Sequence, residues 1–181
     1  MTLEMLPLHP TQDFVTPYDY DTENFTERWW NSPLAPETMK DQRKNDYWSF
    51  RDEGAEIACA WLDKGTIDDV YVGLKPPEEI VDIAFFEVSR RFRRQGYGTS
   101  AVRLLVSHYK GWLLTAFPID AAADAFWSST GFTYRPRKDG TDRRGSRDRT
   151  HDPLYTLDNR WGDASPRTSS CIPRTALPDR G

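Results

Sequence analysis

Apolar and polar residues alternate through much of the first half of the chain, which is the period of a β-strand. This alternation predicts strands at residues 3–9, 47–52, 55–64 and 68–75. Gly54 and Gly65 mark two of the turns between these strands. The longest strand is expected at residues 78–89, and its middle, Ile83 to Phe86, is apolar at consecutive positions. A run of this kind is typical of a strand buried on both faces.

Helical spacing interrupts the strands at three places. Residues 19–31 place Phe25, Trp29 and Trp30 at helical intervals, behind a cap at Asp21 or Thr22. A second short helix is expected from residue 37 to about residue 44. The third helix follows Gly98, where Val102, Leu105, Val106 and Tyr109 fall on one face and Gly111 provides the stop signal.

The last third of the chain continues with a buried strand at residues 112–117 and a helix capped by Asp120 that ends at Ser129. Residues 132–137 and 153–157 predict a final pair of strands. The polar segment between them, residues 138–152, predicts a flexible loop. From Asn159 onward the chain is rich in Pro, Ser and Arg. We therefore expect one domain over residues 1–158 and a tail with little regular structure over residues 159–181.

Composition agrees with one domain, since the chain has 181 residues of which 38% are hydrophobic and 13% aromatic. The N-terminus lacks the basic and apolar regions of a signal peptide, and no stretch approaches the roughly 20 apolar residues of a membrane span. Two cysteines, Cys59 and Cys171, occur outside any metal-binding spacing. These features favour a cytoplasmic protein with free thiols and no metal site.

Charge is divided unevenly along the chain. Residues 1–89 carry 19 acidic and 7 basic side chains, whereas residues 90–181 carry 9 acidic and 17 basic ones. A basic half suits an anionic ligand, and an acidic half suits a cationic one.

The segment RRFRRQGYGTSAVRLL, residues 90–105, places four arginines and two glycines directly before the third helix. A helix N-terminus leaves backbone N–H groups unpaired and carries a partial positive charge. Glycine allows a ligand to approach the backbone closely. The segment therefore predicts a phosphate site, with an exposed basic turn as the alternative. It is neither a P-loop nor a dinucleotide fingerprint, because the lysine and the glycine spacing of those motifs are missing.

Arg93, Gly96 and Gly98 fit the pattern R/Q-x-x-G-x-G/A, so the segment resembles the acyl-CoA pyrophosphate loop of the GNAT superfamily of N-acyltransferases. The later segment AAADAFWSSTGFTYR resembles the closing helix and strand of that family, A-x-x-F-Y-x-x-x-G-F. The resemblance covers residues 1–157. It implies an α/β (α+β) fold with a mixed, mostly antiparallel central sheet, flanked by helices and splayed between its fourth and fifth strands.

The resemblance also implies acetyl-CoA as the acyl donor. The backbone amides of the loop would hold its pyrophosphate, namely those of Arg94, Gln95, Gly96, Tyr97, Gly98 and Thr99, after Arg93 at the start of the motif. The fourth strand, around Phe86 to Val88, would bind the pantetheine arm in the gap beside the fifth strand, around Leu114 to Ala116.

The catalytic residues are less clear from the resemblance. Many relatives have a tyrosine acid where this chain has Trp127, and Tyr134 on the next strand is a conceivable substitute. Glu87 is the natural general base, because a carboxylate in a partly buried cleft next to the thioester has a raised pKa. A packed tyrosine and an ion-paired glutamate are the alternatives. No Ser/His/Asp arrangement is readable.

Acidic and aromatic residues crowd the segment 13–31, which suits an ammonium group. The first hypothesis is therefore direct acetyl transfer to the primary amine of a small molecule or peptide. The loop 135–149, with seven basic and three acidic residues, supports a second hypothesis, a toxin that acylates tRNA. The third is a CoA-binding module without activity, suggested by Trp127. A homodimer is compatible with the resemblance, since GNAT domains often pair.

Overall fold

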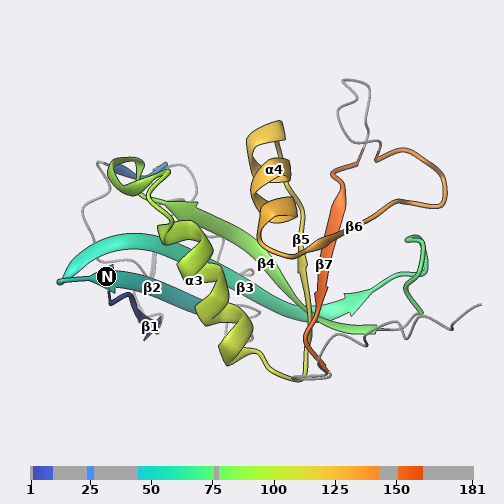
Figure 1. The fold of residues 1–181 in the computed structure, drawn as a ribbon. Helices are drawn as coiled ribbons and strands as arrows, with labels where there is room; N and C mark the ends of the chain where they lie inside the picture. Colours follow the sequence, from blue (N-terminus) through green and yellow to red (C-terminus); the bar gives the residue numbers. More distant parts are fainter. Residues whose placement is uncertain (1, 10–23, 27–44, 76–77, 143–150, 161–181) are drawn as a thin grey trace, which may run out of the picture.

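A seven-stranded sheet is the frame of the molecule (Figure 1), and its strands lie in the order β1-β2-β3-β4-β5-β7-β6. The computed structural model describes residues 2–9, 24–26, 45–75, 78–142 and 151–160. Neighbouring strands are antiparallel except for β4 and β5, which are parallel. The predicted fold class, a mixed and mostly antiparallel sheet, is confirmed.

Most of the predicted elements are present. The strands of the first half are β1 (Glu4–Leu8), β2 (Asp46–Asp52), β3 (Ala55–Ile67) and β4 (Glu78–Val88). They are followed by the 3-10 helix η3 (Arg90–Phe92), α3 (Tyr97–His108), β5 (Leu113–Ala116), α4 (Ala121–Ser129), β6 (Thr133–Arg135) and β7 (Leu154–Asp158). Asp120 caps α4 as predicted, because its side chain accepts a hydrogen bond from the Ala123 N–H at 2.7 Å. The helices predicted at residues 19–31 and 37–44 lie largely outside the described residues.

The strand predicted at residues 68–75 is wrong. Gly65 does not end β3, which continues to Ile67 and pairs with β4 from Ala58 to Ile67. The glycine has no left-handed φ, and pairing with Ile80 across the ladder outweighs its turn signal. Residues 68–75 instead form turns around Gly73 (φ +81°), with one isolated bridge from Tyr71 to Arg137.

The segment expected as a flexible loop is ordered at its beginning. The side chain of Asp142 is buried and accepts hydrogen bonds from the Arg137 N–H at 3.0 Å and the Tyr134 hydroxyl at 3.3 Å. Lys138 forms an ion pair with Asp69. These contacts fold residues 137–142 back onto the turns that follow β3. Local sequence patterns do not indicate them, because Lys138 and Asp69 are 69 residues apart in the chain.

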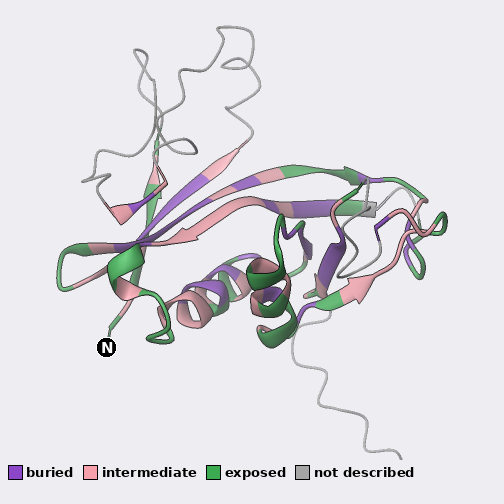
Figure 2. Cartoon of the chain, turned by 90° about the horizontal axis from the view of Figure 1, so that it is seen from above, coloured by how far each residue is buried: buried purple, intermediate pink, exposed green. Residues whose placement is uncertain are grey.

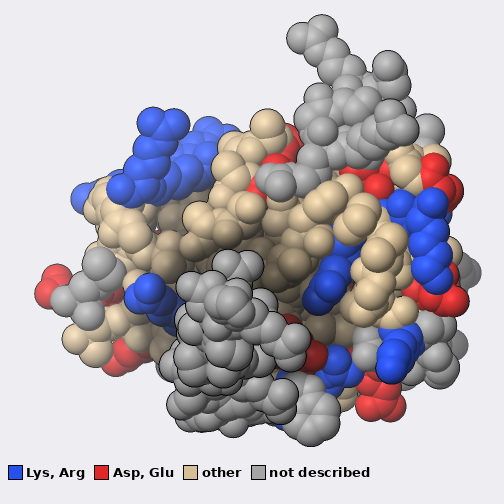
Figure 3. All heavy atoms as spheres, turned by 45° about the vertical axis from the view of Figure 1, so that its right-hand side comes forward, with Lys and Arg blue, Asp and Glu red and all other residues tan. Residues whose placement is uncertain are grey.

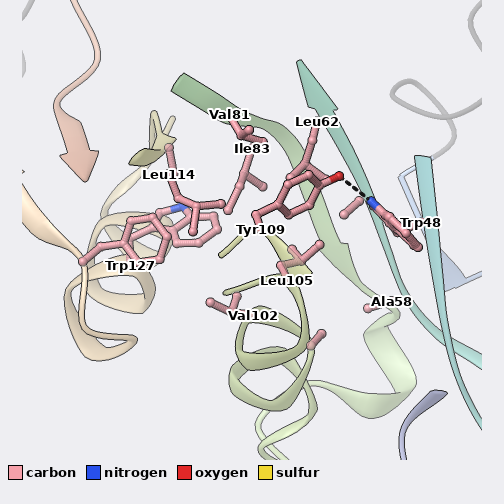
Figure 4. Close-up of a cluster of buried hydrophobic side chains, with 14 of the residues drawn as sticks. Trp48, Ala58, Leu62, Val81, Ile83, Val102, Leu105, Tyr109, Leu114 and Trp127 are labelled. Atoms are coloured by element: carbon pink, nitrogen blue, oxygen red, sulfur yellow. Dashed lines mark hydrogen bonds between the residues drawn. The ribbon is translucent and has the colours of Figure 1, made fainter. Parts of the chain in front are cut away.

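Helices α3 and α4 lie on the same face of the sheet, as the view from above shows (Figure 2). The largest core cluster lies between them and the strands (Figure 4), and Val102 and Leu105 of α3 belong to it, as their spacing predicts. Tyr109 fixes the end of α3 to β2. Its hydroxyl accepts a hydrogen bond from the Trp48 indole at 2.9 Å and donates one to Asp46 at 2.7 Å.

Strand β4 changes direction in its middle. Trp61 of β3 pairs with Phe85 and the next residue, Leu62, pairs with Ile83, so Ala84 is an extra residue on β4. Such a bulge bends a strand and exchanges the faces of the residues after it. This exchange explains the apolar run: both Ile83, before the bulge, and Phe86, after it, pack in the cluster under α3 and α4.

Beyond the bulge β4 separates from β5. The parallel pairing comprises three residue pairs and ends where Asp82 lies opposite Thr115. The rest of β4, up to Val88, is paired with β3 alone. The predicted splay between the fourth and fifth strands is therefore present, and its vertex is the Asp82–Thr115 pair.

Candidate functional site

The loop between β4 and α3 presents backbone N–H groups without partners. Among the described residues, none accepts a hydrogen bond from the backbone N–H groups of residues 94–99, and the first helical bond runs from the Ser100 N–H to the Gly96 carbonyl. The N-terminus of α3 also has no side-chain cap. A helix start with free donors in a row attracts an anion, and its dipole adds to the attraction.

Two residues of this loop adopt left-handed conformations, Arg94 at φ +61° and Gly96 at φ +84°. Arg94 is one of two non-glycine residues with positive φ in the described part of the chain. Left-handed residues alternating with others turn successive N–H groups toward one point, the arrangement of an anion-binding nest. The strained backbone at Arg94 therefore lies where a phosphate would be held.

Gly98 is required by packing. A Cβ atom at this position would lie 3.1 Å from Cε2 of Phe126 and 3.2 Å from Cγ2 of Val88. The start of α3 therefore lies directly on the end of β4 and on α4. This close approach brings the free N–H groups next to the open edge of β4.

The arginines before α3 surround the loop with positive charge. Figure 3 shows Lys and Arg side chains gathered at the upper left, at the end of the molecule where η3 and the start of α3 lie in Figure 1. The Arg93 side chain is engaged within the protein, because it donates to the Val88 carbonyl and to Glu87, each at 2.9 Å. Gln95 donates to the Arg91 carbonyl at 3.0 Å, and the Tyr97 hydroxyl donates to Asp52 at 2.7 Å.

Phe86 and Val88 form one wall of the fork. The Phe86 ring stacks on Phe126 of α4 with centroids 5.6 Å apart, while the backbone of both residues faces no strand on the β5 side. Trp127 is buried against the rings of Phe86 and Phe132. Its indole is thus part of the core that supports the fork.

Glu87 points to the opposite face of β4 and is ion-paired. Its carboxylate accepts hydrogen bonds from the backbone N–H and hydroxyl of Thr26 at 3.0 and 2.8 Å, and from Arg93. It therefore joins the start of the phosphate loop to the segment around Thr26. This position is compatible with a structural role as well as with the predicted role as a base.

Tyr134 lies further from the fork. It is on β6, which is separated from β5 by β7, and its hydroxyl donates to Asp142. Its ring contacts Tyr155 with centroids 5.9 Å apart. The role of this hydroxyl as an acid stays a prediction.

Asp82 is a functional candidate that the sequence reasoning missed. It lies at the vertex of the fork, where the Thr115 hydroxyl donates to its Oδ1 at 2.6 Å, and among the described residues no hydrogen bond reaches Oδ2. Burial raises the pKa of Asp82 to about 6, and the Thr115 hydrogen bond only partly offsets this. The available signal was a single carboxylate inside the apolar run IVDIAFF.

The described residues contain no group of three or more side chains suited to bind a metal ion. None of their helices is long and apolar enough to cross a membrane.

A mixed sheet that forks at one parallel pair, with an uncapped helix start beside the fork, is the architecture of acyl-CoA-dependent acyltransferases. A model of the family described as Acetyltransferase (GNAT) family matches residues 12–132. The chain belongs to the GNAT acetyltransferase family. No curated protein matches the sequence.

Solved structures support the same fold. A mutant of KacT is 14% identical, covers 87% of this chain and 95% of its own, and has a TM-score of 0.57. The AtaT toxin, in a mutant form bound to the C-terminus of the antitoxin AtaR, is 17% identical over 87% of this chain and 92% of its own, with a TM-score of 0.54. A GNAT family acetyltransferase from Elizabethkingia anophelis with acetyl-CoA bound is 15% identical over 86% and 97%, with a TM-score of 0.50. At these identities the likeness concerns the fold.

Proposed function

We propose that this chain transfers an acetyl group from acetyl-CoA directly to a primary amine. The observation that carries the proposal is the row of free N–H groups at residues 94–99 next to the open edge of β4. The N–H groups suit the pyrophosphate of the donor, and the edge of β4 from Phe86 to Val88, which pairs with β3 and with no strand on its other side among the described residues, suits the amide groups of its pantetheine arm. The thioester would then lie toward the vertex of the fork.

The residues at the vertex supply the proton chemistry. An amine is nucleophilic only after it loses a proton, and Asp82 has an oxygen available to accept it. The amine nitrogen then forms a bond to the thioester carbon, the carbon–sulfur bond breaks and the thiolate leaves. The second proton that the nitrogen loses in becoming an amide passes to the thiolate, which gives the CoA thiol. A thiol has a pKa of about 8–9, so the thiolate can leave without a dedicated acid. Tyr134 as that acid and Glu87 as the base remain predictions.

A thiol-release assay with acetyl-CoA and a panel of primary amines tests the proposal. Wild-type protein is expected to release thiol only when an amine is present. Asp82→Asn should lower the rate by about 10²- to 10⁴-fold, the range for loss of a general base. Glu87→Gln, which keeps the shape of the side chain, should retain most of the rate if Glu87 is structural. A loss confined to Glu87→Gln would move the role of the base to that residue.

Acylation of charged tRNA is the second candidate, and the basic residues of the loop 135–149 favour it. In the described part of that loop, Arg137 is paired with Asp139 and Lys138 with Asp69, which reduces the charge offered to a polyanion. This candidate predicts growth arrest on expression and RNA binding that weakens steeply with salt. The absence of both would remove it.

The third candidate is a module that binds CoA without transferring an acyl group. It rests on Trp127, which is buried in the core where many relatives have a tyrosine. Binding of acetyl-CoA without thiol release across the whole amine panel would favour it over the enzyme.

A further inference from the structure

The face of the sheet opposite α3 and α4 carries aromatic rings on both sides of the Asp82 carboxylate. On the β3 side, Trp61 and Phe85 pack with ring centroids 4.9 Å apart. The strand register places Trp61 opposite Phe85, and Asp63 opposite Asp82. The indole of Trp61 donates a hydrogen bond to Asp63 at 2.6 Å. Rings and carboxylates are thus interleaved on this side of the vertex.

A second ring pair lies on the β5 side. Phe117 follows Thr115 by two residues, and its ring lies 6.4 Å from that of Tyr71. Tyr71 itself packs in the cluster that contains Ile80 and Leu113, the face-sharing neighbours of Asp82 and Thr115 along their strands. The vertex is therefore flanked by Phe85 from β4 and by Phe117 after β5.

Exposed apolar side chains lie in the segments that follow β3 and β5 on this side of the sheet. In the described part of the chain four large hydrophobic side chains are classed as exposed, and three of them belong to the two segments flanking this side: Val72 (49%), Phe117 (36%) and Ile119 (61%). Exposed apolar side chains that gather in one place mark a binding surface more often than isolated ones do.

Charge limits what this surface can bind. Asp82 and Asp63 are carboxylates, and two of the nearby cations are paired, Arg137 with Asp139 while it lies over the Tyr71 ring and Lys138 with Asp69. A third cation, Arg135, donates a hydrogen bond to the hydroxyl of Thr156, the residue opposite Thr115. A carboxylate between aromatic rings suits an ammonium group, and the exposed rings suit a hydrocarbon attached to it.

We propose that the acceptor is a hydrophobic primary amine, whose ammonium group contacts Asp82 and whose aromatic or alkyl body lies against Phe85 and Phe117. This proposal rests on the proposed acetyl transfer and narrows its substrate class. It excludes polycations such as polyamines and aminoglycosides as the preferred acceptors, because their additional ammonium groups would lie on apolar surface at a desolvation cost.

The test compares 2-phenylethylamine and hexylamine with ethanolamine and spermidine in the thiol-release assay with saturating acetyl-CoA. The two hydrophobic amines are expected to have a kcat/KM at least about tenfold higher, in line with the burial of several CH₂ groups. A kcat/KM for ethanolamine or spermidine that equals or exceeds those values would overturn the proposal while leaving acetyl transfer intact.

A substitution locates the effect. Phe117→Ala should raise the KM for 2-phenylethylamine about tenfold, leave the KM for ethanolamine nearly unchanged and leave the Kd of acetyl-CoA unchanged. Leu6→Ala is the matched control, because Leu6 is also exposed (39%) but lies on β1 at the far edge of the sheet. An unchanged KM in Phe117→Ala contradicts the proposal. If acetyl-CoA does not bind, or if no amine in the panel leads to thiol release, the proposed acetyl transfer itself is refuted.

Discussion

At the scale of single residues, the site depends on where two carboxylates of β4 point. Glu87 is held by Thr26 and Arg93, whereas Asp82, before the bulge, accepts a hydrogen bond only from Thr115 within the part of the chain that the structure describes. In a regular strand, residues separated by an odd number of positions, such as Asp82 and Glu87, point to opposite faces. The extra residue at the Ala84 bulge lies between them and returns both side chains to the same face. The two side chains are thus separated by Phe85 on the same face, and only Asp82 lies at the vertex.

The pH dependence of the rate follows from the raised pKa of Asp82, about 6. A base acts only when deprotonated, so kcat/KM of the wild type should fall as the pH decreases through about 6. In Asp82→Asn this contribution should disappear, leaving the pH dependence that comes from the amine itself. Rate profiles of both proteins with the same amine measure the difference. Superimposable profiles, scaled by a constant, would contradict the assignment.

Gly98 gives a second prediction at this scale. Gly98→Ala places a methyl group 3.1 Å from Phe126 and 3.2 Å from Val88, so α3 must move away from β4. We expect a loss of about 1–3 kcal/mol in the free energy of unfolding and a higher Kd for acetyl-CoA. Gly65→Ala is the control, since nothing lies within 4 Å of its added methyl group. Chemical denaturation measures the free energy of unfolding, and titration calorimetry measures the Kd for acetyl-CoA. Equal values for Gly98→Ala and Gly65→Ala would be inconsistent with the described packing.

At the scale of elements, the amphipathic helix α3 and the strands around it could be predicted because their apolar positions follow one period. The turn after β3 could not, because Gly65 carries a local signal that the long ladder with β4 overrides. The role of Asp82 was also hidden, because it depends on the point where β4 and β5 stop pairing. Pairing between strands 30 residues apart in the chain leaves no trace in local sequence patterns.

The anchor between α3 and β2 can be tested by Tyr109→Phe. This substitution removes the donor to Asp46 and leaves the buried Trp48 indole N–H without its acceptor. The expected loss in the free energy of unfolding is about 1–3 kcal/mol, from the unsatisfied indole group. Ser107→Ala, at an exposed position on the same helix, should have little effect. A stability of Tyr109→Phe equal to that of the wild type would show that the two hydrogen bonds contribute nothing.

At the scale of the whole molecule, family membership defines the donor side of the reaction better than the acceptor side. The fork and the loop are formed by backbone and glycines, which is why a short motif was enough to predict them. The proposed acceptor surface combines side chains of β4 with side chains of the segments after β3 and β5, including turns that the sequence did not indicate. A homodimer, a cytoplasmic location and a separate tail over residues 159–181 stay predictions. Sedimentation analysis of the full chain and of a chain ending at residue 160 would test the homodimer and the separate tail.

Binding of acetyl-CoA by the start of α3 and the open edge of β4 underlies the whole proposed function. Isothermal titration calorimetry of the full chain with acetyl-CoA measures this binding. We expect saturable binding of one acetyl-CoA per chain with a Kd on the order of micromolar, equivalent to about −8 kcal/mol, and weaker binding by Gly98→Ala than by Gly65→Ala. No detectable binding to the wild type at acetyl-CoA concentrations of about 1 mM would contradict it.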